Sequence, residues 1–184
     1  MAIADLNTTD SGDLTDGQAE IASSALGIIE NAIAHCETMT ALRGRDQIAE
    51  ALRVENPAIH GYFRYSIAQQ IAEYLSGLDE TVVSVYTHSY GDAEEEGEDK
   101  STSLSAPINL ILHVRRKTAA LHSIVAYLDR QLLESYKQLI APEGKRIASI
   151  LDIQLVDDED IHTGRGFGVV LRSSYSKPVR LWPE

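Results

Sequence analysis

Residues 81–114 read TVVSVYTHSYGDAEEEGEDKSTSLSAPINLILHV, and this stretch decides the fold. Its first part, TVVSVYTH, is short and β-branched, which is typical of a strand. Its last part, INLILHV, is apolar on both faces of an extended chain, which is typical of a strand in the interior of a sheet. The acidic and serine-rich residues between the two runs have the composition of a disordered segment. We therefore expect two strands joined by a slack acidic loop at residues 91–106.

Helical patterns lie on both sides of this stretch. Apolar residues recur at helical spacing over residues 16–42, 45–54, 61–77 and 117–140, and each of these ranges predicts a helix. The last of them is long enough to cross from one strand to the next. The resulting class is α+β: N-terminal helices followed by a small mixed β-sheet with a long crossover helix.

Shorter elements complete the chain. ASILDIQLV (148–156) and FGVVLRSSY (167–175) are rich in β-branched residues and predict strands. DDEDIHTGRG (157–166) lies between them and predicts a solvated loop. SKPVRLW (176–182) predicts an edge-like strand, because Pro178 has no N–H group to donate to a ladder.

The net charge of −12 on this chain of 184 residues is concentrated in two segments. Residues 1–20 and 92–99 together hold eleven acids and no base, so the remainder carries a charge near −1. Acidic segments repel nucleic acid at long range, and we do not expect a nucleic-acid partner. We expect residues 1–14 to be disordered, residues 15–60 to form a helical extension, and residues 61–184 to form the α/β domain.

The composition also bears on the compartment. No apolar run approaches the roughly 20 residues that span a bilayer, and the N-terminus lacks the basic start and apolar middle of a signal peptide. We therefore expect a cytoplasmic protein with no membrane partner. The single cysteine, Cys36, lies among apolar residues at helical spacing, and we expect a small buried hydrophobe there.

Three short motifs mark the predicted strands: the first strand ends in VYTHSYG, the second reads INLILHV and the third reads LDIQLV. In the order of their elements, residues 63–182 resemble the nucleotidyltransferase fold, the catalytic-domain family of DNA polymerase β and the small antitoxin-like nucleotidyltransferases. The resemblance implies a Gly-Ser pair after the first strand, two acids at i and i+2 on the second, and one acid on the third. In that family the paired carboxylates hold two Mg²⁺ ions against a triphosphate.

The chain departs from this pattern at most of those positions. Ser89 matches the serine, but His88 replaces the glycine. Asn109 and Ile111 occupy the two acid positions, and Asp152 matches the third acid. A neutral amide and an apolar side chain cannot anchor divalent ions, so the resemblance implies a degenerate active site with no cofactor. We therefore expect a non-catalytic, nucleotidyltransferase-like domain that binds a partner protein or a small ligand.

An active site is the first alternative. Alternation along the strands places polar side chains on one face of the sheet and apolar ones, including Val83 and Val85, on the other. The polar set is Ser84, Tyr86, His88, Asn109, His113, Asp152 and Gln154. Two histidines and an aspartate suffice for a divalent metal, so Asp152 with His88 or His113 would serve a metal-dependent transferase or hydrolase. The candidate catalytic residues are His88, Ser89, Asn109, His113 and Asp152.

A glycine-rich segment offers a second candidate site. HTGRGFG brings together Gly164, Arg165 and Gly166, and glycine-rich loops can cradle phosphate. Such loops need a strand before them and a helix N-terminus after them, whereas a strand is predicted to follow here. The preferred interpretation is a flexible entry into a hairpin, with ligand binding by these residues as the alternative.

The apolar helical pattern of residues 16–54 supports another alternative. A long amphipathic helix that precedes the sheet domain must bury its apolar stripe, and a homodimer is one way to do so. A helical homo-oligomerisation module therefore stands beside the ligand-binding and enzymatic interpretations.

Overall fold

The computed structural model describes most of the chain. The described residues are 11–88, 107–140, 147–175 and 177–183. The expected acidic loop, residues 91–106, lies outside them, and so do residues 1–10 of the segment that we expected to be disordered.

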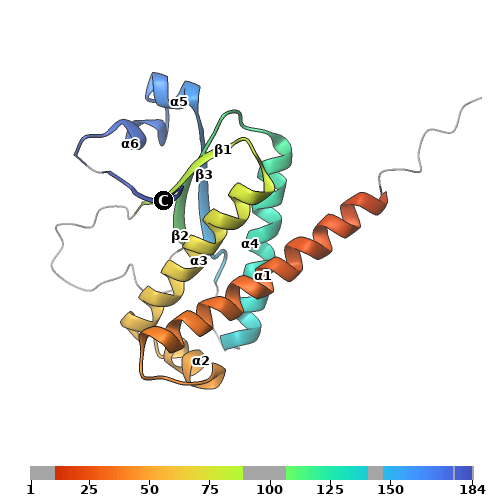
Figure 1. Ribbon diagram of the computed structural model, residues 1–184, viewed down its shortest axis with the longest axis vertical. Helices are drawn as coiled ribbons and strands as arrows, with labels where there is room; N and C mark the ends of the chain where they lie inside the picture. Colours follow the sequence, from red (N-terminus) through yellow and green to blue (C-terminus); the bar gives the residue numbers. More distant parts are fainter. Residues whose placement is uncertain (1–10, 89–106, 141–146, 176, 184) are drawn as a thin grey trace, which may run out of the picture.

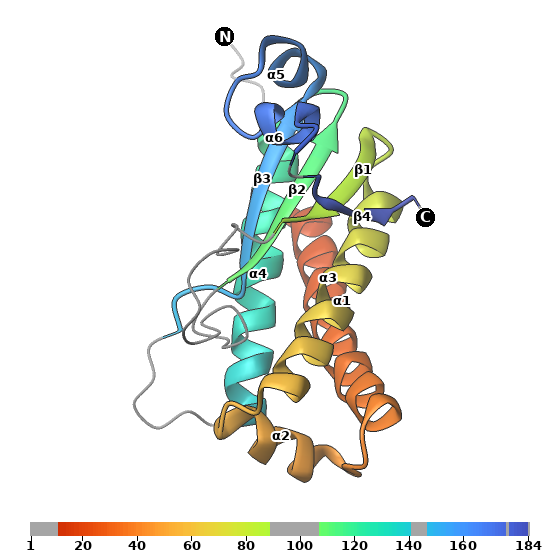
Figure 2. The same ribbon diagram turned by 90° about the vertical axis from the view of Figure 1, so that its left-hand side faces the viewer.

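Helices gather beside one face of a four-stranded sheet (Figures 1 and 2). The longer helices are α1 (Ser11–Met39), α2 (Arg45–Arg53), α3 (Pro57–Leu78) and α4 (Ala119–Ile140). The strands are β1 (Val82–Thr87), β2 (Ile108–Val114), β3 (Leu151–Asp157) and β4 (Val179–Trp182). Two short helices, α5 (Asp158–Thr163) and α6 (Gly168–Arg172), connect β3 to β4. The predicted α+β class is therefore confirmed. No helix within the described ranges is both long and apolar enough to cross a membrane.

The sheet is mixed, with strand order β3-β2-β1-β4. β1 pairs antiparallel with β2 and with β4, whereas β2 and β3 run parallel and are joined by α4 as the crossover helix. The interior position predicted for β2 is confirmed, and so is the edge position predicted for the strand that follows Pro178. One hydrophobic core joins the inward side chains of the strands to α1, α3 and α4.

β1 contains a β-bulge that corrects one part of the predicted pattern. Val82 lies opposite Val114, and Ser84 lies opposite His113, so Val83 is an extra residue on this strand. Val83 is 37% exposed, while Val82 is 6% exposed and faces the core. The prediction that Val83 shares the apolar face with Val85 was wrong, because the bulge shifts the alternation by one residue.

α1 buries its apolar stripe within the chain. The stripe runs from Ile21 to Cys36, and the helix contacts α3 and α4. The predicted helical extension therefore shares its core with the sheet. The helix begins at Ser11 rather than near residue 16, so residues 11–14, which we expected to be disordered, are helical.

Cys36 is fully buried on this stripe, as expected. Its Sγ atom lies 3.7 Å from the carbonyl oxygen of Ile59. Burial raises the pKa of the thiol to about 11. A thiol that stays protonated at neutral pH is a poor nucleophile, so Cys36 acts as a small hydrophobe.

α3 begins earlier than the expected residue 61. Asn56 is its N-cap, and the Asn56 side chain accepts a hydrogen bond from the Ile59 N–H group at 3.2 Å. Pro57 is the first helical residue, where its missing N–H group has no helical partner to lose. The preceding helix, α2, has already ended at Arg53, so the proline starts a helix here and interrupts none.

The region between β3 and β4 differs most from prediction. Residues 157–166, expected to be a loop, contain α5, and residues 167–175, expected to be a strand, contain α6. Asp157 and Asp160 form a capping box, and the acids of the first turn favour the positive end of the helix dipole. The β-branched residues of α6 predicted a strand, but packing against α5 overrides that preference.

Replacement of Leu110 tests the burial of β2. Leu110 is 1% exposed, so Leu110→Asp would bury an unpaired carboxylate and should lower the free energy of unfolding by several kcal/mol. Tyr175→Asp is the control, because Tyr175 is fully exposed at 102%. Urea unfolding at pH 7 measures both variants. Equal midpoints for Leu110→Asp and the wild type would contradict the placement of this strand.

Candidate functional site: the polar face of the sheet

The sheet face opposite the core carries a set of polar side chains. Alternate residues of a strand point to opposite faces, and Val85, Leu110 and Leu112 point into the core. The register therefore puts cross-strand rows on the other face: Ser84, His113 and Val156; Tyr86, Ile111 and Gln154; Asn109 and Asp152. Most of the polar set expected from the sequence lies on this face.

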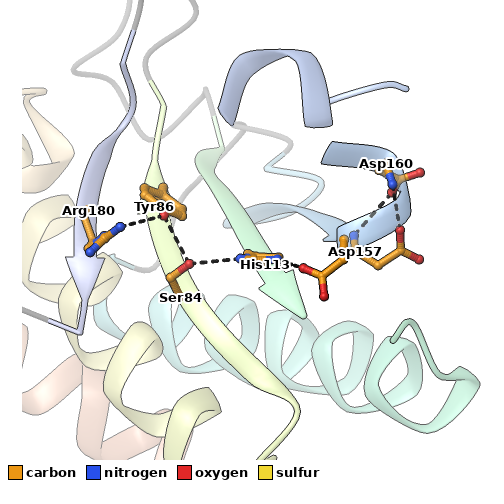
Figure 3. A network of polar contacts seen from close by, with 7 residues as sticks. Ser84, Tyr86, His113, Asp157, Asp160 and Arg180 are labelled. Carbon is orange, nitrogen blue, oxygen red and sulfur yellow. Dashed lines mark hydrogen bonds and ion pairs between the residues drawn. The ribbon is translucent and has the colours of Figure 1, made fainter. Parts of the chain in front are cut away.

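A chain of hydrogen bonds runs across this face (Figure 3). Arg180 on β4 donates from Nη2 to the Tyr86 hydroxyl at 3.2 Å. The Ser84 Oγ atom lies 3.2 Å from the Tyr86 hydroxyl and 3.3 Å from His113 Nδ1. On the far side of the ring, Nε2 of His113 lies 2.8 Å from Asp158 Oδ1 on α5. We call these five residues the polar chain.

The two ends of the polar chain are exposed to solvent, and its middle is shielded from solvent. Ser84 is 4% exposed, whereas the side chain of His113 is 14% exposed and that of Asp158 is 73% exposed. Each hydroxyl can both donate and accept, so the chain can match either tautomer of His113. When Nδ1 carries a proton it donates to Ser84, and when it does not it accepts from Ser84.

The order Ser84, His113, Asp158 matches the sequence of roles in nucleophilic catalysis: a hydroxyl, a base and an orienting carboxylate. The environment does not suit that chemistry. Ser84 is buried, and its oxygen is shared between Tyr86 and His113. A substrate carbonyl would have to displace one of these side chains to reach Oγ. The polar chain is therefore better suited to hold side chains in place than to attack a substrate.

The other predicted catalytic residues lie along a different row. Asn109 lies opposite Asp152, and the N–H group of His88 donates to the Asn109 carbonyl oxygen at 3.3 Å. Asp152 accepts a hydrogen bond of 2.6 Å from the Gln154 amide. Ser89 lies outside the described residues.

The row of Asp152 is distant from His113. Asn109, the neighbour of Asp152, is four residues from His113 along β2, which is roughly 13 Å in a strand. The structure therefore does not bring together Asp152 and His113, one of the two pairs suggested for a metal site. Among the residues that the structure describes, no group of three or more His, Cys, Asp or Glu side chains could hold a metal ion.

The glycine-rich segment connects α5 to α6. Gly164 ends α5 in the left-handed conformation at φ 65°, which glycine adopts without strain. The N–H groups of Gly164 and Arg165 donate back to the Ile161 and Asp160 carbonyl oxygens at 3.4 and 2.9 Å. These donors therefore close the end of a helix instead of pointing toward a ligand.

Asp160 anchors α5 to the rest of the fold. Its side chain accepts a hydrogen bond from Lys117, just after β2, and it completes the capping box with Asp157. The hydrogen bond from Lys117 is the main cause that lowers the pKa of Asp160 below its ordinary value of 3.8. The anchor keeps Asp158, at the start of the same helix, beside His113.

Sequence reasoning missed the two ends of the polar chain. The spacing of Asp157 and Asp160 is that of a capping box with aspartate in place of the usual Ser/Thr and Glu. It could have identified α5, and with it the position of Asp158. Arg180 carries no such signal, because its partner Tyr86 is fixed by strand pairing between distant parts of the chain.

Comparison of the chain with protein-family models, with curated proteins and with solved structures gave no match. The resemblance to nucleotidyltransferases therefore stays a prediction.

Gly168 tests the packing of α6 on α5. A Cβ atom at this position would lie 2.2 Å from the backbone oxygen of Asp160, so Gly168→Ala must push the two helices apart. We expect a loss of roughly 1–3 kcal/mol in the free energy of unfolding, or faster amide exchange confined to α5 and α6. Gly27→Ala is the matched control, because nothing lies within 4 Å of its added Cβ atom. The idea fails if both variants behave like the wild type.

The lowered pKa of Asp160 predicts a pH dependence. The Asp160 carboxyl binds a proton less tightly in the folded protein than in the unfolded chain. The ion pair with Lys117 therefore stabilises the fold fully above the ordinary pKa of 3.8, and this stabilisation is lost as the pH falls through the lower pKa of the folded state. The wild type should therefore be more stable than Lys117→Met at pH 7, and the difference should shrink on acidification. Urea unfolding across pH measures this, with Lys137→Met as the surface control. A difference that stays constant with pH would refute the anchor.

Proposed function

We propose that this chain is a non-catalytic binding domain with a nucleotidyltransferase-like arrangement, which holds a small anionic ligand on the polar face of its sheet. The observation that carries the proposal is the placement of Arg180. Its guanidinium lies 5.5 Å from the centre of the Tyr86 ring and donates to the Tyr86 hydroxyl, while the residue stays exposed to solvent. A guanidinium held in this way still has N–H donors free to meet a phosphate or carboxylate.

The distribution of charge on the polar face supports a ligand with a defined orientation. Arg180 lies at the β4 edge, and the carboxylates lie at the other end, with Asp152 on β3 and Asp158 on α5. Uncharged donors and acceptors, Ser84 and Tyr86 among them, lie between. An anionic group is attracted to the β4 side and repelled from the β3 side. A nucleotide is the first class to test, because the nucleotidyltransferase resemblance suggests it.

The residues in the expected acid positions support binding without catalysis. Asn109 provides a dipole and no charge, and Ile111 is 1% exposed. Asp152 is the one carboxylate at the three positions. Two-metal phosphoryl transfer needs carboxylates that hold both ions against the reacting phosphate. We therefore propose that no cofactor takes part.

A homodimer through residues 16–54 is not part of the proposal. The apolar stripe of α1, which suggested such a dimer, is buried within the chain against α3 and α4.

The proposal predicts nucleotide binding without turnover. With labelled ATP and Mg²⁺ or Mn²⁺, we expect no transfer to the protein, to RNA or to small acceptors. In metal-free calorimetry we expect ATP to bind and Arg180→Ala to weaken binding by about tenfold, which corresponds to the loss of one charge-assisted hydrogen bond. Arg45→Ala is the control, since it removes the same charge from an exposed side chain at the start of α2, and this helix lies at the far end of the molecule (Figure 2).

Three outcomes would overturn the proposal. Turnover that is abolished by Asp152→Ala would show that the domain is an enzyme. Failure of ATP to bind, or equal binding by Arg180→Ala and the wild type, would remove the polar face as the site for an anionic ligand.

A further inference from the structure

A cavity of about 360 Å³ lies among the helices, apart from the polar face. It opens where α1 passes the C-terminal end of α3 and the N-terminal half of α4. Its lining includes Glu20 and Ile21 of α1, Tyr74 of α3, and Ser123, Tyr127 and Arg130 of α4. They come from three helices that are far apart in the sequence.

The interior of this cavity is apolar and aromatic. Ile21 is 8% exposed and belongs to the core, and Tyr74, Ile124 and Tyr127 are half-buried against it. The volume falls within the range of roughly 300–1,000 Å³ found for small-molecule sites. A cavity of about 150 Å³ already accepts benzene, so there is space here for one or two rings.

The rim of the cavity carries two charges. The Arg130 guanidinium lies 5.1 Å from the centre of the Tyr127 ring, and it makes no ion pair within the part of the chain that the structure describes. Glu20 lines the cavity near Tyr74: burial raises the pKa of the Tyr74 phenol, and the charge of Glu20 adds to the rise. Arg130 is thus available to a negatively charged group of a ligand, and Glu20 disfavours a ligand that carries further negative charge.

We propose that this cavity binds an aromatic monoanion of one or two rings. The rings lie against Tyr74 and Tyr127, where aromatic side chains favour offset or edge-on contacts. The acidic group meets the guanidinium of Arg130, which is already oriented by Tyr127. Glu20 selects against di- and triphosphates. The site is separate from the polar face and does not depend on the function proposed above.

The probes for this site are 2-naphthoate and its neutral isostere 2-naphthamide. Calorimetry at pH 7 should show one naphthoate bound per chain, about fivefold tighter than the amide, as expected for one half-exposed charged contact. Arg130→Gln should abolish this preference while the chain stays folded by circular dichroism. Ser123→Trp places a large side chain in the cavity and should weaken both probes at least tenfold.

The controls separate this site from the polar face. Arg180→Ala should leave naphthoate binding unchanged, and Arg130→Gln should leave ATP binding unchanged. The proposal is overturned if neither probe binds, if the wild type does not prefer the anion, or if Arg130→Gln keeps that preference. Unchanged binding by folded Ser123→Trp would show that the probes bind elsewhere, which also overturns it.

Discussion

The burial of β2 is the constraint on which the rest of the structure depends. This strand lies between β1 and β3, and five of its residues, including Leu112 and Val114, are buried. A strand with neighbours on both sides has every backbone group committed to a ladder. Its parallel neighbour can be reached only by a crossover connection, and α4 supplies this. The helices must then cover the apolar side of the sheet, which places α1, α3 and α4 together.

The same constraint determines where polar groups can gather. Once the even-numbered residues of β2 face the core, Asn109, Ile111 and His113 must face the other way. The pairing of β1 and β4 then adds Ser84, Tyr86 and Arg180 to that face. The polar chain is therefore a product of strand register, and only Asp158 reaches it from a helix. Because Asp158 depends on the capping of α5, the outer end of the chain is held by local hydrogen bonds and by Lys117.

Strong local patterns made the core of this fold predictable from sequence. INLILHV is apolar on both faces, and the predicted helices have clear periodicity in their apolar residues. Prediction failed where tertiary packing decides. The valines of α6 favour a strand, yet Gly168 lets α6 pack closely on α5. In the candidate site, the face shared by Ser84, Tyr86 and His113 follows from alternation along the strands. The contribution of Arg180 depends on long-range pairing, which no local pattern reveals.

The β-bulge in β1 gives this strand a tolerance to changes in chain length. Val83 is the extra residue opposite the β2 ladder, and Val82 and Ser84 already pair with consecutive residues of β2. Loss of Val83 would leave an uninterrupted ladder with Ser84 and Tyr86 on the same face as before. Loss of a residue after Ser84 would instead move the side chains on one side of the deletion to the opposite face of the sheet. A related sequence that is one residue shorter at this point could therefore keep the whole polar face, and an alignment should place its gap at Val83.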